Sequence, residues 1–141
     1  RLTVVEIEGH PDNVAPAIFG GFTVSTTKGH HVESFSFLSK LRLRFVVAVP
    51  DFYLPTKKAR EVLPETVPMA DAIFNIGRAS MLVAALMKGS EHFLKRSFDD
   101  ALHQPYRAAL IPGMFAAGAL GTVLSGAGPC LIAFTLERAG K

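Results

Sequence analysis

The chain has a single cysteine, Cys130, among 141 residues. A lone cysteine cannot form an internal disulfide, which is typical of proteins from a reducing compartment. No apolar run approaches the roughly 18 residues that a membrane-spanning helix needs. The stretch from Ala79 to Met87 is too short, and Lys88 ends it. We therefore expect a cytoplasmic protein without a membrane partner.

Charge is also scarce, because only 19% of the residues are charged and the formal net charge is +3. There is no basic arm with interleaved aromatic residues, so we expect no nucleic-acid partner. The mild excess of basic residues suits an anionic ligand such as a nucleotide. His30 and His31 have no cysteine or acidic neighbour at metal-ligand spacing, so we predict no metal site. A Gly-x-Ser-x-Gly nucleophile elbow is absent as well.

The chain is long enough for one domain with a substantial core, and 49% of its residues are hydrophobic. We find no signal peptide pattern, and the first residue is arginine rather than methionine. These observations suggest a piece of a longer protein.

The order of hydrophobic patterns predicts the fold class. Alternating or apolar runs predict strands, and apolar residues three and four apart predict helices. We expect strands over 22–26, 32–38, 43–49, 122–124 and 131–134, and helices over 14–19, 57–63, 69–87, 90–97, 104–110 and 112–117. Asp12 and Thr56 are the expected caps of the first two helices. Strands, then helices, then strands indicate an α+β fold with an antiparallel sheet covered on one face.

One dense polar segment stands near the start of the chain, at His10-Pro11-Asp12-Asn13. A neutral histidine and an asparagine amide each offer a donor and an acceptor, so they can orient a small polar substrate. The simpler interpretation is a polar helix cap with one core histidine.

A glycine-rich segment, Ser125-Gly126-Ala127-Gly128-Pro129, lies between two predicted strands. Glycines allow backbone NH groups to approach an anion closely. No Lys-Ser or Lys-Thr pair follows, so this is not a P-loop. The alternative is a tight turn.

Two arginines, Arg78 and Arg107, have apolar neighbours. Arginine binds carboxylate or phosphate through two parallel hydrogen bonds. Surface ion pairing is the alternative for both. We expect His92 and His103 to be structural, and Cys130 to be a small core residue.

Four segments together resemble homoserine kinase, of the GHMP small-molecule kinase superfamily. They are EGHPDNVAP (8–16), HQPYR (103–107), LIPG (110–113) and LSGAGP (124–129). The first is specific to homoserine kinases, and the last is a more general superfamily signature. The match runs in the same order from about Glu8 to Phe134.

The resemblance implies an enzyme that phosphorylates the side-chain hydroxyl of L-homoserine with ATP and Mg²⁺, on the route to threonine. By this analogy residues 1–27 end the N-terminal domain, and 28–141 form the ferredoxin-like C-terminal domain.

The resemblance also implies roles for the segments. His10, Asp12 and Asn13 would line the homoserine pocket, with Asn13 at the reacting hydroxyl. Arg78 and Arg107 would clamp the substrate carboxylate. The loop Ser125, Gly126, Ala127 and Gly128 would close over the substrate and the phosphates.

The chain departs from the family in three respects, and the mildest is Cys130, at a place where serine or threonine is common. The glycine- and serine-rich loop that holds ATP is absent, and the acidic Mg²⁺ ligand is expected upstream of Arg1. We therefore expect ATP and Mg²⁺ to be bound mainly by a region missing here, and this chain alone to be inactive. Two alternatives stay open: a non-catalytic ligand-sensing or interaction domain derived from such a kinase, and another GHMP kinase of mevalonate or sugar type. The oligomeric state is open too, a homodimer included.

Overall fold

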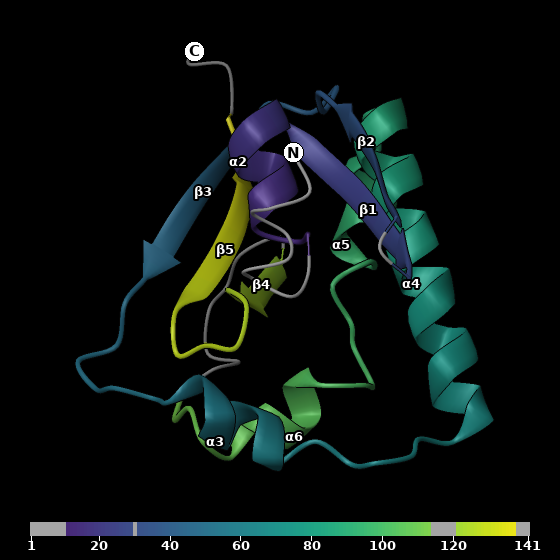
Figure 1. Cartoon of the computed structure of the whole chain (residues 1–141). Helices are drawn as coiled ribbons and strands as arrows, with labels where there is room; N and C mark the ends of the chain where they lie inside the picture. The colour runs from purple at the N-terminus through teal and green to yellow at the C-terminus, as the bar shows by residue number, and fades with distance from the viewer. Residues whose placement is uncertain (1–10, 30, 114–120, 138–141) are drawn as a thin grey trace. The chain divides into compact units, whose positions relative to one another are not determined.

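The structure is a computed structural model that describes residues 11–29, 31–113 and 121–137. The chain divides into two compact units, residues 1–40 and 41–141. The colour in Figure 1 runs through them from purple to yellow.

In its described residues, the first unit consists of a short helix and a hairpin. Its elements are α2 (Val14–Phe19), β1 (Phe22–Lys28) and β2 (His31–Phe37). The strands pair antiparallel, from Phe22 opposite Phe37 to Lys28 opposite His31. Gly21 makes the step from helix to strand with a positive φ of 66°, a conformation that favours glycine. A side chain there would also meet the carbonyl oxygen of Phe37 at 2.6 Å.

The domain boundary expected after residue 27 falls inside β1. The physical reason is the hairpin, because every residue of β2 pairs with a residue of β1. Residues 28–40 therefore stay with the first unit in the structure.

The second unit contains a three-stranded antiparallel sheet. Its strands are β3 (Leu43–Ala48), β4 (Gly121–Leu124) and β5 (Leu131–Leu136). The spatial order is β3-β5-β4, so the last strand of the described chain lies in the middle (Figure 1). Phe134 of β5 is opposite both Phe45 and Gly121. The predicted α+β class with an antiparallel sheet is confirmed.

The described part of the second unit also contains four helices. They are α3 (Thr56–Glu61), α4 (Met69–Lys88), α5 (Glu91–Lys95) and α6 (Gln104–Ala108). The helix predicted over 112–117 lies mainly outside the described residues.

The helix ends follow from proline and glycine. Pro55 and Pro68 are the N-cap residues of α3 and α4, and their carbonyls accept the first helical hydrogen bonds. The prediction that Thr56 caps α3 is wrong, because Pro55 already holds the extended cap conformation and Thr56 is the first helical residue. Asp12 is likewise not the cap of α2, since Asn13 occupies that position. Gly89 ends α4 with a left-handed φ of 78°.

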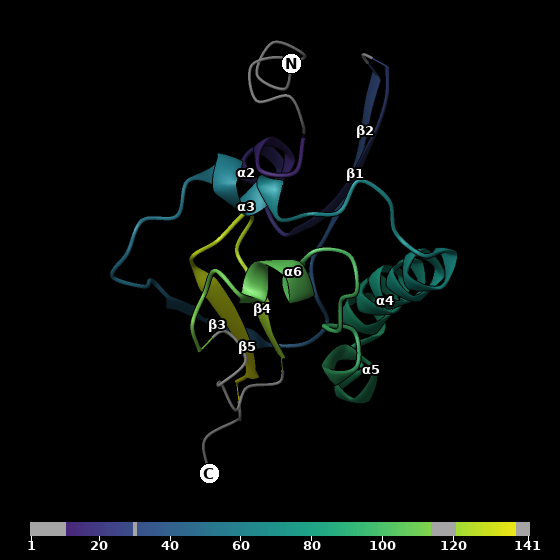
Figure 2. The ribbon, with the colours of Figure 1, turned by 90° about the horizontal axis from the view of Figure 1, so that it is seen from below.

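Apolar packing at two places stabilises the described part of the second unit. In one, α5 packs against α4 (Figure 2), and Leu86 and Leu94 are almost completely buried. The other joins α3, the end of α6 and the β4–β5 turn through Leu54, Ala59, Ile111 and Leu124. The second cluster fixes α3, α6 and the glycine-rich turn relative to one another.

By length and composition, α4 alone among the described helices could cross a membrane, with a mean hydropathy of 1.3 over its apolar window. The sequence prediction counted only uninterrupted apolar residues and did not include it. Mid-helix side chains of α4 bond to the segment after α5: Asn75 to Asp100, and Arg78 to the carbonyl of Arg96. These bonds attach the middle of α4 to the segment that follows α5, whereas only 11% of the apolar window of α4 is buried.

An aromatic contact constrains the start of β4. The Phe98 ring lies 4.7 Å from the Phe134 ring, centroid to centroid, and directly over Gly121. A Cβ atom at position 121 would overlap the Phe98 ring. Only glycine therefore leaves room for this contact.

Gly121→Ala is expected to lower the free energy of unfolding by about 1–3 kcal/mol, because Phe98 must leave its place. The matched control is Gly77→Ala in α4, where no described atom lies within 4 Å of the new methyl group. That change is expected to raise stability by about 0.5–1 kcal/mol, since alanine favours a helix interior. Urea unfolding of both variants measures the difference, and equal effects would contradict the packing argument.

Candidate functional site

The first polar segment lies in the first unit. His10 is outside the described residues. Asp12 and Asn13 are exposed at the start of α2, and the Asn13 backbone NH donates to Asp12 Oδ1 at 3.0 Å. The Asn13 side chain makes no capping hydrogen bond to the helix. Its amide is therefore not used in the way that the simpler interpretation, a polar cap, requires.

The glycine-rich segment forms the turn between β4 and β5. The Ser125 NH donates to the Cys130 carbonyl at 2.9 Å, and the Gly128 NH donates to the Ser125 carbonyl at 3.1 Å. Gly126 and Gly128 have positive φ angles of 59° and 88°. A side chain at Gly128 would also come within 2.8 Å of Ile111. The alternative interpretation as a tight turn is thus correct as a description of its backbone.

This turn also has two backbone NH donors that are not used within the described residues. The NH groups of Gly126 and Ala127 have no acceptor within the described ranges, and Gly126 is exposed. Successive backbone NH groups beside left-handed glycines are a common way of binding an anion. The same four residues, 125–128, can therefore form a tight turn and also bind an anion.

Arg107 is held against this turn by neutral acceptors. Its Nε donates to the Ala59 carbonyl of α3 at 2.9 Å. Its Nη1 donates to the Gly126 carbonyl at 3.3 Å and contacts His103 Nδ1 at 3.4 Å. Two segments distant in sequence, α3 and the β4–β5 turn, and His103 four residues earlier therefore fix one guanidinium group.

The charge of Arg107 has no carboxylate within ion-pair distance among the described residues. Burial and the neighbouring Arg60 lower the pKa of Arg107, and Asp100 opposes them. Arginine stays protonated at neutral pH in spite of such shifts. A fixed cation without a direct counter-ion, beside two unused NH groups, is suited to an anionic ligand.

Arg78 has different surroundings. Its Nη1 donates to the Arg96 carbonyl at 2.6 Å, its Nη2 lies 3.5 Å from Asp99 Oδ2, and the guanidinium lies over the Phe74 ring at 4.6 Å. These contacts connect α4 to the segment that follows α5. The contacts described for Arg78 and Arg107 have no partner in common, so the carboxylate clamp stays a prediction.

Asp100 is a residue that the sequence analysis missed. Its carboxylate accepts hydrogen bonds from Asn75 Nδ2 and from the backbone NH groups of Leu102, His103 and Gln104. Burial alone would raise the pKa of Asp100, but these four donors outweigh it and lower the pKa below its ordinary value. Asp100 thus positions the first turn of α6, which carries Arg107.

The signal for Asp100 is present in the sequence. An aspartate shortly before a helix commonly accepts hydrogen bonds from the first NH groups of that helix. Asp100 precedes His103 and Gln104 by three and four residues, and the proline that follows them indicates a helix start. Gln104 adds a second link, because its Oε1 accepts from the Leu124 NH at 3.3 Å and its Nε2 donates to the Phe98 carbonyl at 3.4 Å. The helix with Arg107 is thereby tied to β4.

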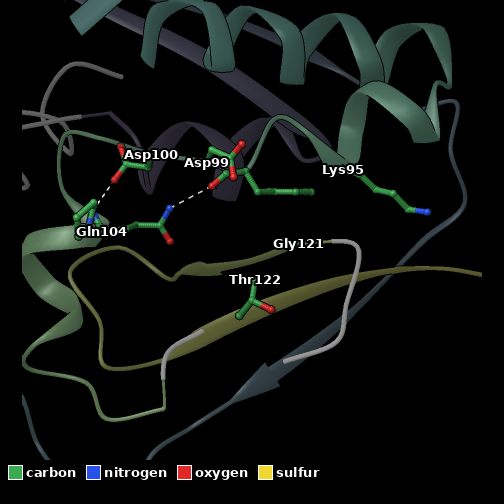
Figure 3. Close-up of a pocket in the computed structure, with 8 residues that line it drawn as sticks. Lys95, Asp99, Asp100, Gln104, Gly121 and Thr122 are labelled. Carbon is green, nitrogen blue, oxygen red and sulfur yellow. Dashed lines mark hydrogen bonds between the residues drawn. The ribbon is translucent and has the colours of Figure 1, made fainter. Parts of the chain in front are cut away.

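A cavity of about 330 Å³ lies beside this network, between α5, the start of α6 and β4 (Figure 3). Lys95, Asp99, Asp100, Gln104, Gly121 and Thr122 are labelled among its lining residues. Asp100 and Gln104 use their polar atoms in the structural bonds above, and the Thr122 hydroxyl is buried with no partner in the described part of the chain. Arg107 does not line this cavity.

No group of three histidine, cysteine, aspartate or glutamate side chains that could hold a metal ion occurs in the described ranges. Cys130, directly before β5, is half-buried and forms no disulfide.

Comparison with known proteins gives one consistent result. Homoserine kinase of Moorella thermoacetica is 48% identical over 142 residues, which is 96% of this chain and 48% of that protein. Homoserine kinase of Clostridium botulinum is 44% identical over 136 residues, or 92% of this chain and 46% of that protein. The chain thus spans about half the length of these curated relatives. No protein-family model matches it.

The fold is similar as well. The crystal structure of homoserine kinase from Cytophaga hutchinsonii superposes with a TM-score of 0.84 at 31% identity, and covers 92% of this chain and 43% of that protein. This similarity agrees with the predicted GHMP C-terminal fold.

Proposed function

Because this chain is similar to homoserine kinases in sequence and fold over more than nine-tenths of its length, we propose that it is the C-terminal portion of such an enzyme. The reaction would transfer the γ-phosphoryl group of ATP, with Mg²⁺, to the side-chain hydroxyl of L-homoserine in threonine biosynthesis. A cytoplasmic location follows from this assignment.

The observation that carries the proposal is the environment of Arg107. A guanidinium held by the carbonyls of Ala59 and Gly126, without a carboxylate in contact in the described ranges, is suited to an anionic substrate. Homoserine carries one carboxylate, and its capture by Arg107 would fix the position of the distant hydroxyl. Catalysis of phosphoryl transfer depends mainly on positioning and charge neutralisation.

The remaining residues have supporting roles in this proposal. Arg78 would be the second donor to the carboxylate, and His10 and Asp12 would line the homoserine pocket. Asn13 hydrogen-bonds the reacting hydroxyl. Its exposed amide, which makes no cap bond, supports this role. An amide orients a hydroxyl without acting as a strong base.

The turn Ser125–Gly128 would face the anionic groups. The NH groups of Gly126 and Ala127, which have no acceptor in the described ranges, support this role. Bound ATP would supply the phosphoryl group, and Mg²⁺ would neutralise part of the phosphate charge. This chain has no glycine- and serine-rich phosphate loop of its own to hold ATP.

Two other functions compete with this one. A ligand-sensing domain derived from a kinase would keep Arg107 and its surroundings and would lack an ATP site. A mevalonate- or sugar-directed GHMP kinase would keep the ATP site and change the substrate. Arg107 has no carboxylate within ion-pair distance in the described ranges, which favours a substrate with a carboxylate, such as homoserine or mevalonate, over a sugar.

The test compares the chain with the reading frame that contains it. We expect no ADP release from ATP and L-homoserine with this chain alone, and turnover with the longer protein when the frame includes a phosphate loop. Mevalonate and galactose serve as control acceptors. Turnover by the chain alone would contradict the predicted dependence on the missing region. A longer protein that binds homoserine without turnover would establish the sensing function instead.

A further inference from the structure

The contact between His103 and Arg107 has no role in the function proposed above. Both residues belong to the first turns of the α6 segment, four positions apart, and the Nη1···Nδ1 distance is 3.4 Å. Arginine has only donors, so the imidazole must accept at Nδ1 and carry its hydrogen at Nε2. The Nε2 atom lies 3.6 Å from Asp100 Oδ2, and the negative carboxylate favours a hydrogen on Nε2.

The charge state of His103 agrees with this arrangement. Burial lowers the pKa of His103, Asp100 opposes that effect, and Arg107 adds to it. The imidazole is therefore neutral near pH 7 and has a lone pair at Nδ1. The described titratable groups that affect it are Asp100 before the helix and Arg107 on the helix.

The donors of Arg107 can be counted. Nε is used by the Ala59 carbonyl, and the two hydrogens of Nη1 face the Gly126 carbonyl and His103 Nδ1. The two hydrogens of Nη2 have no partner among the described residues. His103 thus completes the set of acceptors that keeps Nη1 occupied and leaves Nη2 for a ligand.

We propose that His103 is a positioning residue for substrate binding, which orients the Arg107 guanidinium by accepting a hydrogen bond at Nδ1. The inference rests on the proposed function, in which Arg107 binds the homoserine carboxylate. His103 does not touch the substrate in this scheme. Without its acceptor, one Nη1 hydrogen is released and the guanidinium can turn about its remaining two bonds.

Two substitutions distinguish a role of His103 as a hydrogen-bond acceptor from a role in packing alone. In His103→Asn the amide oxygen stands near the place of Nδ1, whereas His103→Phe keeps a ring and removes the acceptor. Both are prepared in the longer enzyme that contains this chain. We expect the KM for homoserine to rise about threefold to tenfold in the phenylalanine variant, with kcat nearly unchanged, since one modest hydrogen bond is lost. The asparagine variant should recover most of that loss.

The double variant His103→Phe/Arg107→Ala tests whether His103 acts through Arg107. Its KM should equal that of Arg107→Ala alone, because there is no longer a guanidinium to orient. Thermal unfolding of each variant is measured in parallel. The side chain of His103 is 39% exposed, so both single variants are expected to fold.

Each outcome decides the question. A phenylalanine variant with unchanged KM, or an asparagine variant no better than phenylalanine, would overturn the role of His103. If Arg107→Ala raises KM in the same experiment, the proposed function stands and only this inference fails. If Arg107→Ala also leaves KM unchanged, Arg107 is outside the substrate site and the proposed function loses its main support.

Discussion

Arg107→Ala is expected to weaken homoserine binding by about 2–4 kcal/mol, roughly 30- to 1,000-fold. The reason is the fixed geometry of the guanidinium, which three acceptors hold beside the glycine-rich turn. A small substrate with one carboxylate has few other groups to compensate for the loss. Isothermal calorimetry on the longer enzyme measures the change directly.

Two further variants serve as controls for the Arg107→Ala result. Arg107→Lys keeps the charge but loses the planar set of donors, so binding should recover only in part. Arg44→Ala removes a cation that is 65% exposed and paired with Glu137, and homoserine affinity should stay unchanged. Equal losses for Arg44→Ala and Arg107→Ala would indicate a general effect of charge, which would contradict a specific carboxylate site.

Asp100→Ala is expected to lower the free energy of unfolding by about 2–4 kcal/mol, the largest stability effect that we predict. The carboxylate is only 7% exposed and accepts four hydrogen bonds, three of them from backbone NH groups at the start of α6. Its removal leaves these donors without a partner. Urea unfolding measures the loss. Asp99→Ala is the control, since Asp99 is 65% exposed and forms one ion pair, and it should cost less than about 1 kcal/mol.

The Asp100 carboxylate also predicts that the free energy of unfolding decreases at acid pH. The pKa of Asp100 is lower in the folded protein than its ordinary value. Its contribution to stability is therefore complete above the unfolded pKa of about 3.9, and is lost as the pH falls through the lower folded pKa. Asp100→Asn should make the stability less dependent on pH below about 4. If the loss of stability below about pH 4 is the same in Asp100→Asn, other carboxylates cause it.

Much of the fold could be predicted because the local signals agree with the tertiary structure. The apolar period of α4 and the glycine that ends it define a helix of 20 residues. The serine–glycine segment between two apolar runs marks the β4–β5 turn, and its paired register follows. The helix starts were less accurate. At Pro55 the choice of Thr56 as a cap failed because proline conformation, rather than a hydroxyl, sets the start.

The site was less accessible from the sequence. The arginine and the turn were identified by residue type, but the acceptor that holds Nε is a backbone carbonyl 48 residues away. Backbone carbonyls have no sequence signature, so no motif could have indicated Ala59. His103 was assigned a structural role for a related reason. A helix was expected over 104–110, but the four-residue spacing alone does not show that Arg107 uses His103 Nδ1 as an acceptor.

The use of a main-chain oxygen at Ala59 has an evolutionary consequence. Natural variation can exchange Lys57 and Lys58, which are exposed on α3, without removing that acceptor. An insertion or deletion between residues 55 and 62 would instead displace the oxygen and misdirect the guanidinium. Among homologous enzymes with this chemistry, we therefore expect side chains on α3 to drift while its number of residues stays constant.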